Sequence, residues 1–208
     1  MEWPQLVRGV RECGTPSLQP NCNIKETGLK WFFTSVRPPV TIAVPGAFVI
    51  GNENVIGYLN EVLWVHLRAV NQYALDGEIL AGWSYRDLGR RSRRQATAKR
   101  QQAEALSKRI LALGGAPCAG CAALPIAGKN AKDLLDSQLG RERAALSCLH
   151  DAISAARDAG DGSSLELLET ILAEGEEQVD WLEVQLFMIR ELGVENFLAA
   201  QIGAQGNG

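Results

Sequence analysis

The sequence predicts an all-α protein, built as a four-helix bundle with a long connection between the second and third helices. Three observations support this fold class. Apolar residues recur every three and four positions over four long stretches, which is the period of an amphipathic helix. Glycines separate these stretches, and the middle break is much longer than the others. The first 51 residues hold six of the eight prolines and show no such period.

Composition and charge limit the classes of function. The chain has 208 residues, 46% of them hydrophobic, which suffices for the core of one domain with a short appendage. A net charge of −3 argues against a general nucleic-acid binder. No apolar run is long enough to span a bilayer, and the N-terminus lacks a secretory signal. An odd number of cysteines, five, argues against a secreted disulfide framework, so we expect a cytoplasmic protein.

Residues 1–51 are predicted to form an irregular, Pro-rich N-terminal extension. Cys13 and Cys22 lie in it, and we expect inert thiols there rather than a disulfide or a metal pair. The apolar cluster Trp31-Phe32-Phe33 would dock on the bundle or on a partner.

Two helices precede the long connection. The first is predicted from Asn52 to about Leu80, and the second from about Tyr85 to Leu113, where a Gly-Gly pair ends it. Their inward apolar positions are Val55, Ile56, Leu59, Val62, Leu63, Leu67, Val70 and Tyr73 in the first, and Leu88, Ala96, Ala103, Leu106, Ile110 and Leu113 in the second.

The connection, residues 114–129, is long enough to carry the chain from one end of a bundle to the other. A third helix is then predicted from about Ala131 to Ala159. The CxxC pair Cys118 and Cys121 lies in the connection. It is half of a zinc site and no second pair follows, so no metal is expected there.

The fourth helix is predicted to begin with Ser163 or Ser164 as its N-cap, with Glu166 near the capping-box position, and to end at Leu192. A short fifth helix, Glu195 to Ile202, and a Gly-rich tail follow. The bundle domain is thus expected over residues 52–203, and the tail over 204–208.

Arginine is concentrated at the start of the second helix, in the run 90–94. Such a run can bind phosphate or nucleic acid. We favour a solvated or subunit-facing helix, balanced by acidic residues such as those of the fourth helix.

A pair of metal ions inside a four-helix bundle needs a Glu from each of two helices and a Glu-x-x-His from each of the others. The corresponding segments here are Lys99-Arg100-Gln101-Gln102 and Gly175-Glu176-Glu177-Gln178. The spacing is retained, but the first Glu and the His are absent from both segments.

From Asn54 to Ile202 the sequence resembles bacterioferritin, the haem-containing branch of the ferritins. The resemblance is carried by five groups of residues: Val55-Ile56-Gly57-Tyr58-Leu59-Asn60; Ala69-Val70-Asn71-Gln72-Tyr73 with Trp83; Arg109-Ile110-Leu111 with Gly115 and Pro117; Val179-Asp180-Trp181-Leu182-Glu183; and Leu192-Gly193 with Asn196-Phe197-Leu198 and Gln201-Ile202.

The resemblance implies a ferritin-like bundle and a hollow cage of many subunits that stores iron mineral. It also implies a di-iron ferroxidase centre in each subunit, and a haem held by a Met from each of two subunits. Placed on this sequence, the implied iron ligands fall on His66, Lys99, Gln102, Glu142, Gly175 and Gln178. Only Glu142 is the family's residue, and the haem Met falls on Arg100.

We therefore expect no catalytic residues, no resident metal and no haem, although stored iron mineral stays possible. Arg100 has no lone pair for iron, and Met188 lies elsewhere. Lys99 and Glu142 are expected to form an ion pair that acts as a polar plug in place of the metals. The alternative is that Lys99 reaches solvent and Glu142 is hydrated.

The favoured function is a structural subunit of an iron-storage cage, a pseudoenzyme that assembles with itself or with an active bacterioferritin subunit. One alternative is an ordinary iron-storage bacterioferritin with slow mineralisation. Another is a non-enzymatic scaffold that acts through residues 1–48. Val49 aligns with the usual first residue of a bacterioferritin, so those residues are either a real extension or sequence upstream of a start at Val49.

Overall fold

The computed structural model describes residues 52–118 and 128–203, and nearly all of them are helical. The elements are α1 (Glu53–Gly82), α2 (Arg86–Ala112), α3 (Ala131–Asp158), α4 (Gly162–Leu192) and α5 (Val194–Gly203). These described ranges contain no strand. The prediction of an all-α, ferritin-like four-helix bundle with a short C-terminal fifth helix is confirmed.

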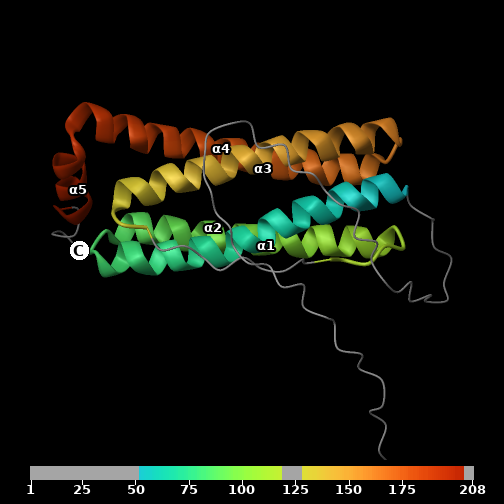
Figure 1. Ribbon diagram of the computed structural model, residues 1–208, viewed down its shortest axis with the longest axis horizontal. Coiled ribbons are helices and arrows are strands. Elements are labelled where there is room, and N and C mark those ends of the chain that lie inside the picture. The colour runs from blue at the N-terminus through green and yellow to red at the C-terminus, as the bar shows by residue number, and fades with distance from the viewer. Residues whose placement is uncertain (1–51, 119–127, 204–208) are drawn as a thin grey trace, which may run out of the picture. The chain divides into compact units, whose positions relative to one another are not determined.

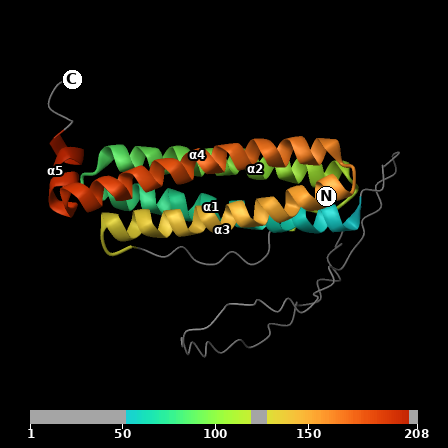
Figure 2. The ribbon, with the colours of Figure 1, turned by 90° about the horizontal axis from the view of Figure 1, so that it is seen from above.

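The four long helices lie side by side as two hairpins, α1 with α2 and α3 with α4 (Figure 1). In Figure 1, α2 and α3 run in the same direction, so the connection between them carries the chain from one end of the bundle to the other. Viewed from above, α5 lies across the end of the bundle at which α4 finishes (Figure 2). The predicted crossover is thus present.

Helix boundaries agree with the predicted ones to within one or two residues, but the predicted N-cap of α4 is wrong. Asp161 is the cap, and its side chain accepts a hydrogen bond from the Ser164 backbone N–H at 3.1 Å. Ser163 and Ser164 lie inside the helix. Arg109 also contacts this helix start: its Nη2 donates to Asp161 Oδ1 and its Nε donates to Ser164 Oγ.

Two glycines bring α1 and α2 together near their shared turn. A Cβ added at Gly89 would lie 2.7 Å from the Gly77 carbonyl oxygen, which is closer than a real Cβ approaches. Both residues are buried. Any side chain at position 89 would therefore push the two helices apart.

The apolar core consists of two clusters, one toward each end of the bundle. The first includes Leu59, Leu63, Leu106 and Leu168, and the second includes Leu80, Leu134, Leu135, Leu182 and Phe197. Buried polar residues occupy the helix positions between the two clusters, and they include His66, Lys99, Glu142 and Gln178. This polar layer is the candidate functional site.

Several predictions concern residues outside the described ranges. Cys13, Cys22, Cys121 and the Trp31-Phe32-Phe33 cluster all belong there. Of the described cysteines, Cys118 is exposed and Cys148 is half-buried. Burial, followed by the charges of two nearby carboxylates, raises the pKa of the Cys148 thiol to about 11, so it stays protonated. None of the described helices is long and apolar enough to span a bilayer.

Candidate functional site: a buried polar cluster

Each of the four long helices contributes to the polar layer. Lys99 and Gln102 come from α2, Glu142 from α3, Gln178 from α4, and His66 and Tyr73 from α1. All six are buried. An uncompensated polar group in such a position costs free energy, so its partners matter.

Lys99 and Glu142 form an ion pair at the centre of this cluster. Lys99 Nζ donates to Glu142 Oε2 at 2.8 Å, and the two side chains are only 4% and 2% exposed. The alternative in which Lys99 reaches solvent is therefore wrong. The structure places the cation of one helix directly on the carboxylate of another, two residues that are 43 positions apart in the chain.

Tyr73 donates the second hydrogen bond to the Glu142 carboxylate. Its hydroxyl donates to Glu142 Oε1 at 2.8 Å, so each carboxylate oxygen accepts one hydrogen bond from a buried donor. Burial, followed by the negative charge of Glu142, raises the pKa of Tyr73 well above its ordinary value. The phenol therefore stays protonated and remains a donor.

His66 lies in the same layer as a neutral imidazole. Its Nδ1 lies 2.8 Å from the Val62 carbonyl oxygen, which can only accept, so Nδ1 carries the proton. Its Nε2 is buried and has no partner among the residues that the structure describes. Burial, followed by the positive charge of Lys99, lowers the pKa of His66 to about 4, although the bond to Val62 opposes this shift.

Two residues of α2 hold the Gln178 side chain of α4 in place. Its Oε1 accepts from Gln95 Nε2 at 2.7 Å and from Arg91 Nη2 at 2.9 Å. The Arg91 guanidinium also lies over the Trp181 ring, 5.0 Å from its centroid. Three donors therefore occupy the amide oxygen of Gln178, because Arg91 Nε lies 3.2 Å from it as well.

Gln102 is held by the Glu174 carboxylate, which was not among the predicted site residues. Gln102 Nε2 donates to Glu174 Oε2 at 2.5 Å, and its buried Oε1 has no partner within the described ranges. The two family ligand positions on α2, Lys99 and Gln102, thus both contact a carboxylate. Neither offers an anionic group of its own.

Gly175 contributes no side chain, and the space beside it is taken. A Cβ at this position would lie 2.8 Å from Leu146 Cδ2 of the neighbouring helix. The residue is buried. An apolar side chain therefore lies where a ligand from position 175 would begin.

A second polar cluster lies nearer the α1–α2 turn and was not predicted. Asp76 is fully buried and accepts from Gln72, Gln138 and Arg141, at 2.8, 3.0 and 2.8 Å. Gln138 also reaches Ser92 of α2 at 3.2 Å. Donors from α1 and α3 thus satisfy both oxygens of this carboxylate.

Sequence signals for these additional residues exist but are weak. Tyr73 was placed on the inward face by the helical period, yet its hydroxyl partner could not be inferred. Asp76 follows Tyr73 by three positions, so an acid on the apolar face was visible. Nothing in the sequence indicates the contacts of Arg91, Gln95 and Glu174, which join residues far apart in the chain.

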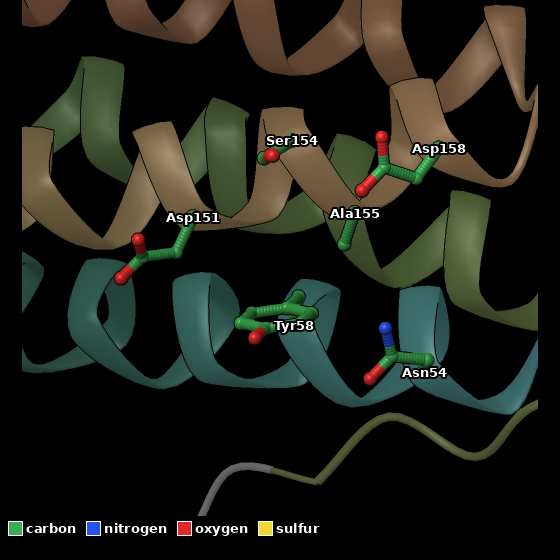
Figure 3. Close-up of a pocket in the computed structure, with 6 residues that line it drawn as sticks. All are labelled: Asn54, Tyr58, Asp151, Ser154, Ala155 and Asp158. Atoms are coloured by element: carbon green, nitrogen blue, oxygen red, sulfur yellow. The ribbon is translucent and has the colours of Figure 1, made fainter.

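A shallow polar hollow lies between α1 and α3, away from the cluster just described (Figure 3). Asn54 and Tyr58 line it on α1, and Asp151, Ser154 and Asp158 line it on α3. Burial, followed by the charge of Asp151, raises the pKa of nearby Glu61. The residues that the structure describes contain no group of three or more His, Cys, Asp or Glu placed to hold a metal ion.

A di-iron centre does not fit the donor set of the central cluster. Two iron ions need several anionic oxygen ligands. Here one family carboxylate, Glu142, is present, and an ammonium is bound to it. The free lone pairs of His66 Nε2 and Gln102 Oε1 are neutral and add no charge.

Haem ligation does not fit either. Arg100 is exposed on α2 and its guanidinium has no lone pair to give to iron. Met188 lies on α4, among side chains packed against the second apolar cluster.

Comparison with known proteins agrees with the fold. The family described as Ferritin-like domain matches residues 56–192. Bacterioferritin of Mycobacterium leprae is 34% identical over 149 residues, 72% of this chain and 94% of that protein. Bacterioferritin BfrA of Mycobacterium tuberculosis is 32% identical over the same shares. Bacterial ferritin of Pseudomonas aeruginosa is 33% identical over 153 residues, 73% of this chain and 99% of that protein. The chain therefore belongs to the ferritin-like family, and it is similar to the bacterioferritins.

Proposed function

We propose that this chain is a bacterioferritin-type subunit of an iron-storage assembly and has no ferroxidase centre of its own. One observation carries the second half of the proposal. The buried Lys99–Glu142 ion pair lies at the positions that hold iron ligands in the family it resembles, with 2.8 Å between Nζ and Oε2.

Charge supports an inactive centre. In a site with an effective dielectric constant of about 20, a unit charge 4 Å away changes an ion's energy by about 4 kcal/mol per unit of ion charge. The Lys99 ammonium therefore opposes any divalent cation beside Glu142. Removing the ammonium alone would still leave too few anionic ligands.

The packing around Gly175 supports the same conclusion. Leu146 fills the space beside this glycine, and Gln178 is engaged by Gln95 and Arg91 through its only acceptor atom. Neither Gly175 nor Gln178, the two family ligand positions on α4, therefore offers a free ligand atom for iron. The cluster instead joins all four helices by hydrogen bonds, which is a structural role.

Stopped-flow oxidation of Fe(II) tests this proposal. We expect Fe(II) mixed with the purified protein to consume oxygen no faster than Fe(II) in buffer without protein. The control is a bacterioferritin with all six ligands, measured at the same subunit concentration. Oxidation as fast as in that control would overturn the absence of a ferroxidase centre.

Assembly with other subunits has separate support. The end of α4 and helix α5 expose several large apolar side chains, and exposed groups of this kind are typical of protein interfaces. They are Val184, Phe187, Leu192, Val194 and Ile202. We propose that this chain forms a homo- or hetero-oligomer with bacterioferritin-type subunits.

Co-expression with a tagged, active bacterioferritin tests the hetero-oligomer. We expect the untagged chain to co-purify in a large particle that oxidises Fe(II) in proportion to its content of active subunits. Recovery of the chain only in particles that contain no active subunit would exclude co-assembly and favour the homo-oligomer. Deletion of residues 1–48 in the same experiment distinguishes the scaffold alternative, which requires loss of association.

A further inference from the structure

The exposed face of α2 carries an unusual concentration of positive charge. The helix has nine basic residues and two acidic ones, whereas the whole chain has a net charge of −3. Five of these basic residues are exposed and lie near the start and middle of the helix: Arg86, Arg90, Arg93, Arg94 and Arg100. They are all arginine, and none belongs to the buried cluster.

These side chains point to one side of the helix. Successive residues in an α-helix turn by about 100°, so the five arginines fall within about one third of the circumference. They extend over roughly 20 Å of helix at about 1.5 Å per residue. The face is therefore a stripe, one helix wide.

Much of this charge has no internal partner. Arg86, Arg94 and Arg100 make no hydrogen bond or ion pair with any residue in the described part of the chain. Arg90 and Arg93 have exposed partners, Asp87 at 3.0 Å and Glu78 at 3.2 Å. Exposed pairs of this kind contribute little and leave the guanidinium available to other anions.

The arrangement has an electrostatic cost that an anion would relieve. Arg86, Arg90 and Arg94 follow one another at four-residue intervals, and like charges at this spacing destabilise a helix. Because α2 is held by its buried contacts, the arginines cannot separate. A polyanion along the stripe would neutralise them together.

We infer that this stripe is a binding site for a short linear polyphosphate. Arginine binds phosphate through paired N–H donors. A single carboxylate can also accept such a pair, but a linear polyphosphate offers successive phosphate groups that can each bind a different arginine of the stripe. The stripe is too narrow to enclose a duplex, and the acidic net charge of the chain opposes a long nucleic acid. The proposal is independent of the Lys99–Glu142 pair and goes beyond the proposed function.

Equilibrium binding of sodium tripolyphosphate to the purified full chain, measured by calorimetry, tests the inference. The test variant is Arg86→Gln/Arg90→Gln/Arg94→Gln. The matched control is Arg143→Gln/Arg157→Gln/Arg190→Gln, which removes the same charge from exposed arginines on α3 and α4. Circular dichroism verifies that both variants fold.

We expect the test variant to lose about tenfold or more in affinity, while the control stays within about twofold. The slope of log affinity against log salt should become shallower by about two in the test variant, since each phosphate contact contributes about 0.7 to 0.9. Orthophosphate should bind much more weakly, because it spans one arginine pair at most.

Three outcomes would overturn the inference. The first is equal weakening in the test and control variants, which would mean diffuse attraction. The second is no saturable binding of tripolyphosphate by the wild-type chain. The third is equal affinity for oligoglutamate of matched charge, which would assign the stripe to an acidic polypeptide instead.

Discussion

At the scale of single residues, the central feature is a carboxylate held by two buried donors. Glu142 accepts from Lys99 through one oxygen and from Tyr73 through the other. A buried ion pair adds little net stability compared with apolar residues of similar size. Removing one partner, however, leaves an uncompensated charge in the interior.

Lys99→Met should therefore lower the free energy of unfolding by roughly 3–5 kcal/mol. The double variant Lys99→Met/Glu142→Gln should recover most of the loss, because the neutral amide oxygen introduced at position 142 would still accept from Tyr73. Chemical denaturation measures both. Lys108→Met, which changes an exposed lysine of the same helix, serves as the control and should have an effect within about 0.5 kcal/mol. Equal stability of Lys99→Met and Lys108→Met would exclude a structural role for the pair.

His66 should contribute a measurable pH dependence. Its pKa falls from 6.5 to about 4 in the folded protein, so between these values the unfolded chain binds more protons than the native one. Stability therefore rises with pH through this window and is lost as the pH falls, with a slope of up to about 1.4 kcal/mol per pH unit from this group.

His66→Leu should remove that component. The comparison is the difference in unfolding free energy between pH 7 and pH 4.5, measured for the wild type and for the variant. We expect a smaller difference in the variant. Identical pH dependence in the two proteins would show that His66 titrates normally in the native state.

At the scale of helices, the glycines differ in what surrounds them. A Cβ at Gly140 meets nothing within 4 Å, whereas a Cβ at Gly175 meets Leu146. Gly140→Ala should therefore stabilise the protein by up to about 1 kcal/mol through helix propensity. Gly175→Ala should gain less or be destabilising, and thermal melting of the two variants decides between these expectations. A larger gain at Gly175 would mean that Leu146 moves aside freely.

The start of α4 gives a second prediction at this scale. Asp161→Ala removes the N-cap and the partner of Arg109, so it should cost about 1 kcal/mol. Ser163→Ala should cost almost nothing, because Ser163 is exposed and makes no hydrogen bond in the described structure. Chemical denaturation of both variants measures the difference, and the reverse order would restore Ser163 as the cap.

The same helix end shows what the sequence could and could not reveal. Asp161, Ser163 and Ser164 are all good N-caps within four positions, so local preference could not choose among them. Asp161 also binds Arg109, which lies more than 50 positions earlier in the chain, and local sequence preference does not include such a contact. The helical period did predict the four long helices, because it depends only on neighbours along the chain.

At the scale of the whole bundle, the central cluster was partly predictable. The resemblance placed His66, Lys99, Gln102, Glu142 and Gln178 at one level of four helices. It could not give the orientation of Gln178 or the contact between Gln102 and Glu174, because both depend on side-chain rotamers. The Asp76 cluster was missed since no family position drew attention to it.

Iron binding at the central cluster is the most direct test of this account. Crystals of the full chain soaked anaerobically in Fe(II) would be measured at the iron absorption edge, which locates iron by its anomalous scattering. We predict no anomalous peak among His66, Lys99, Glu142 and Gln178, with Lys99 still bound to Glu142. Two iron peaks between these side chains would contradict it.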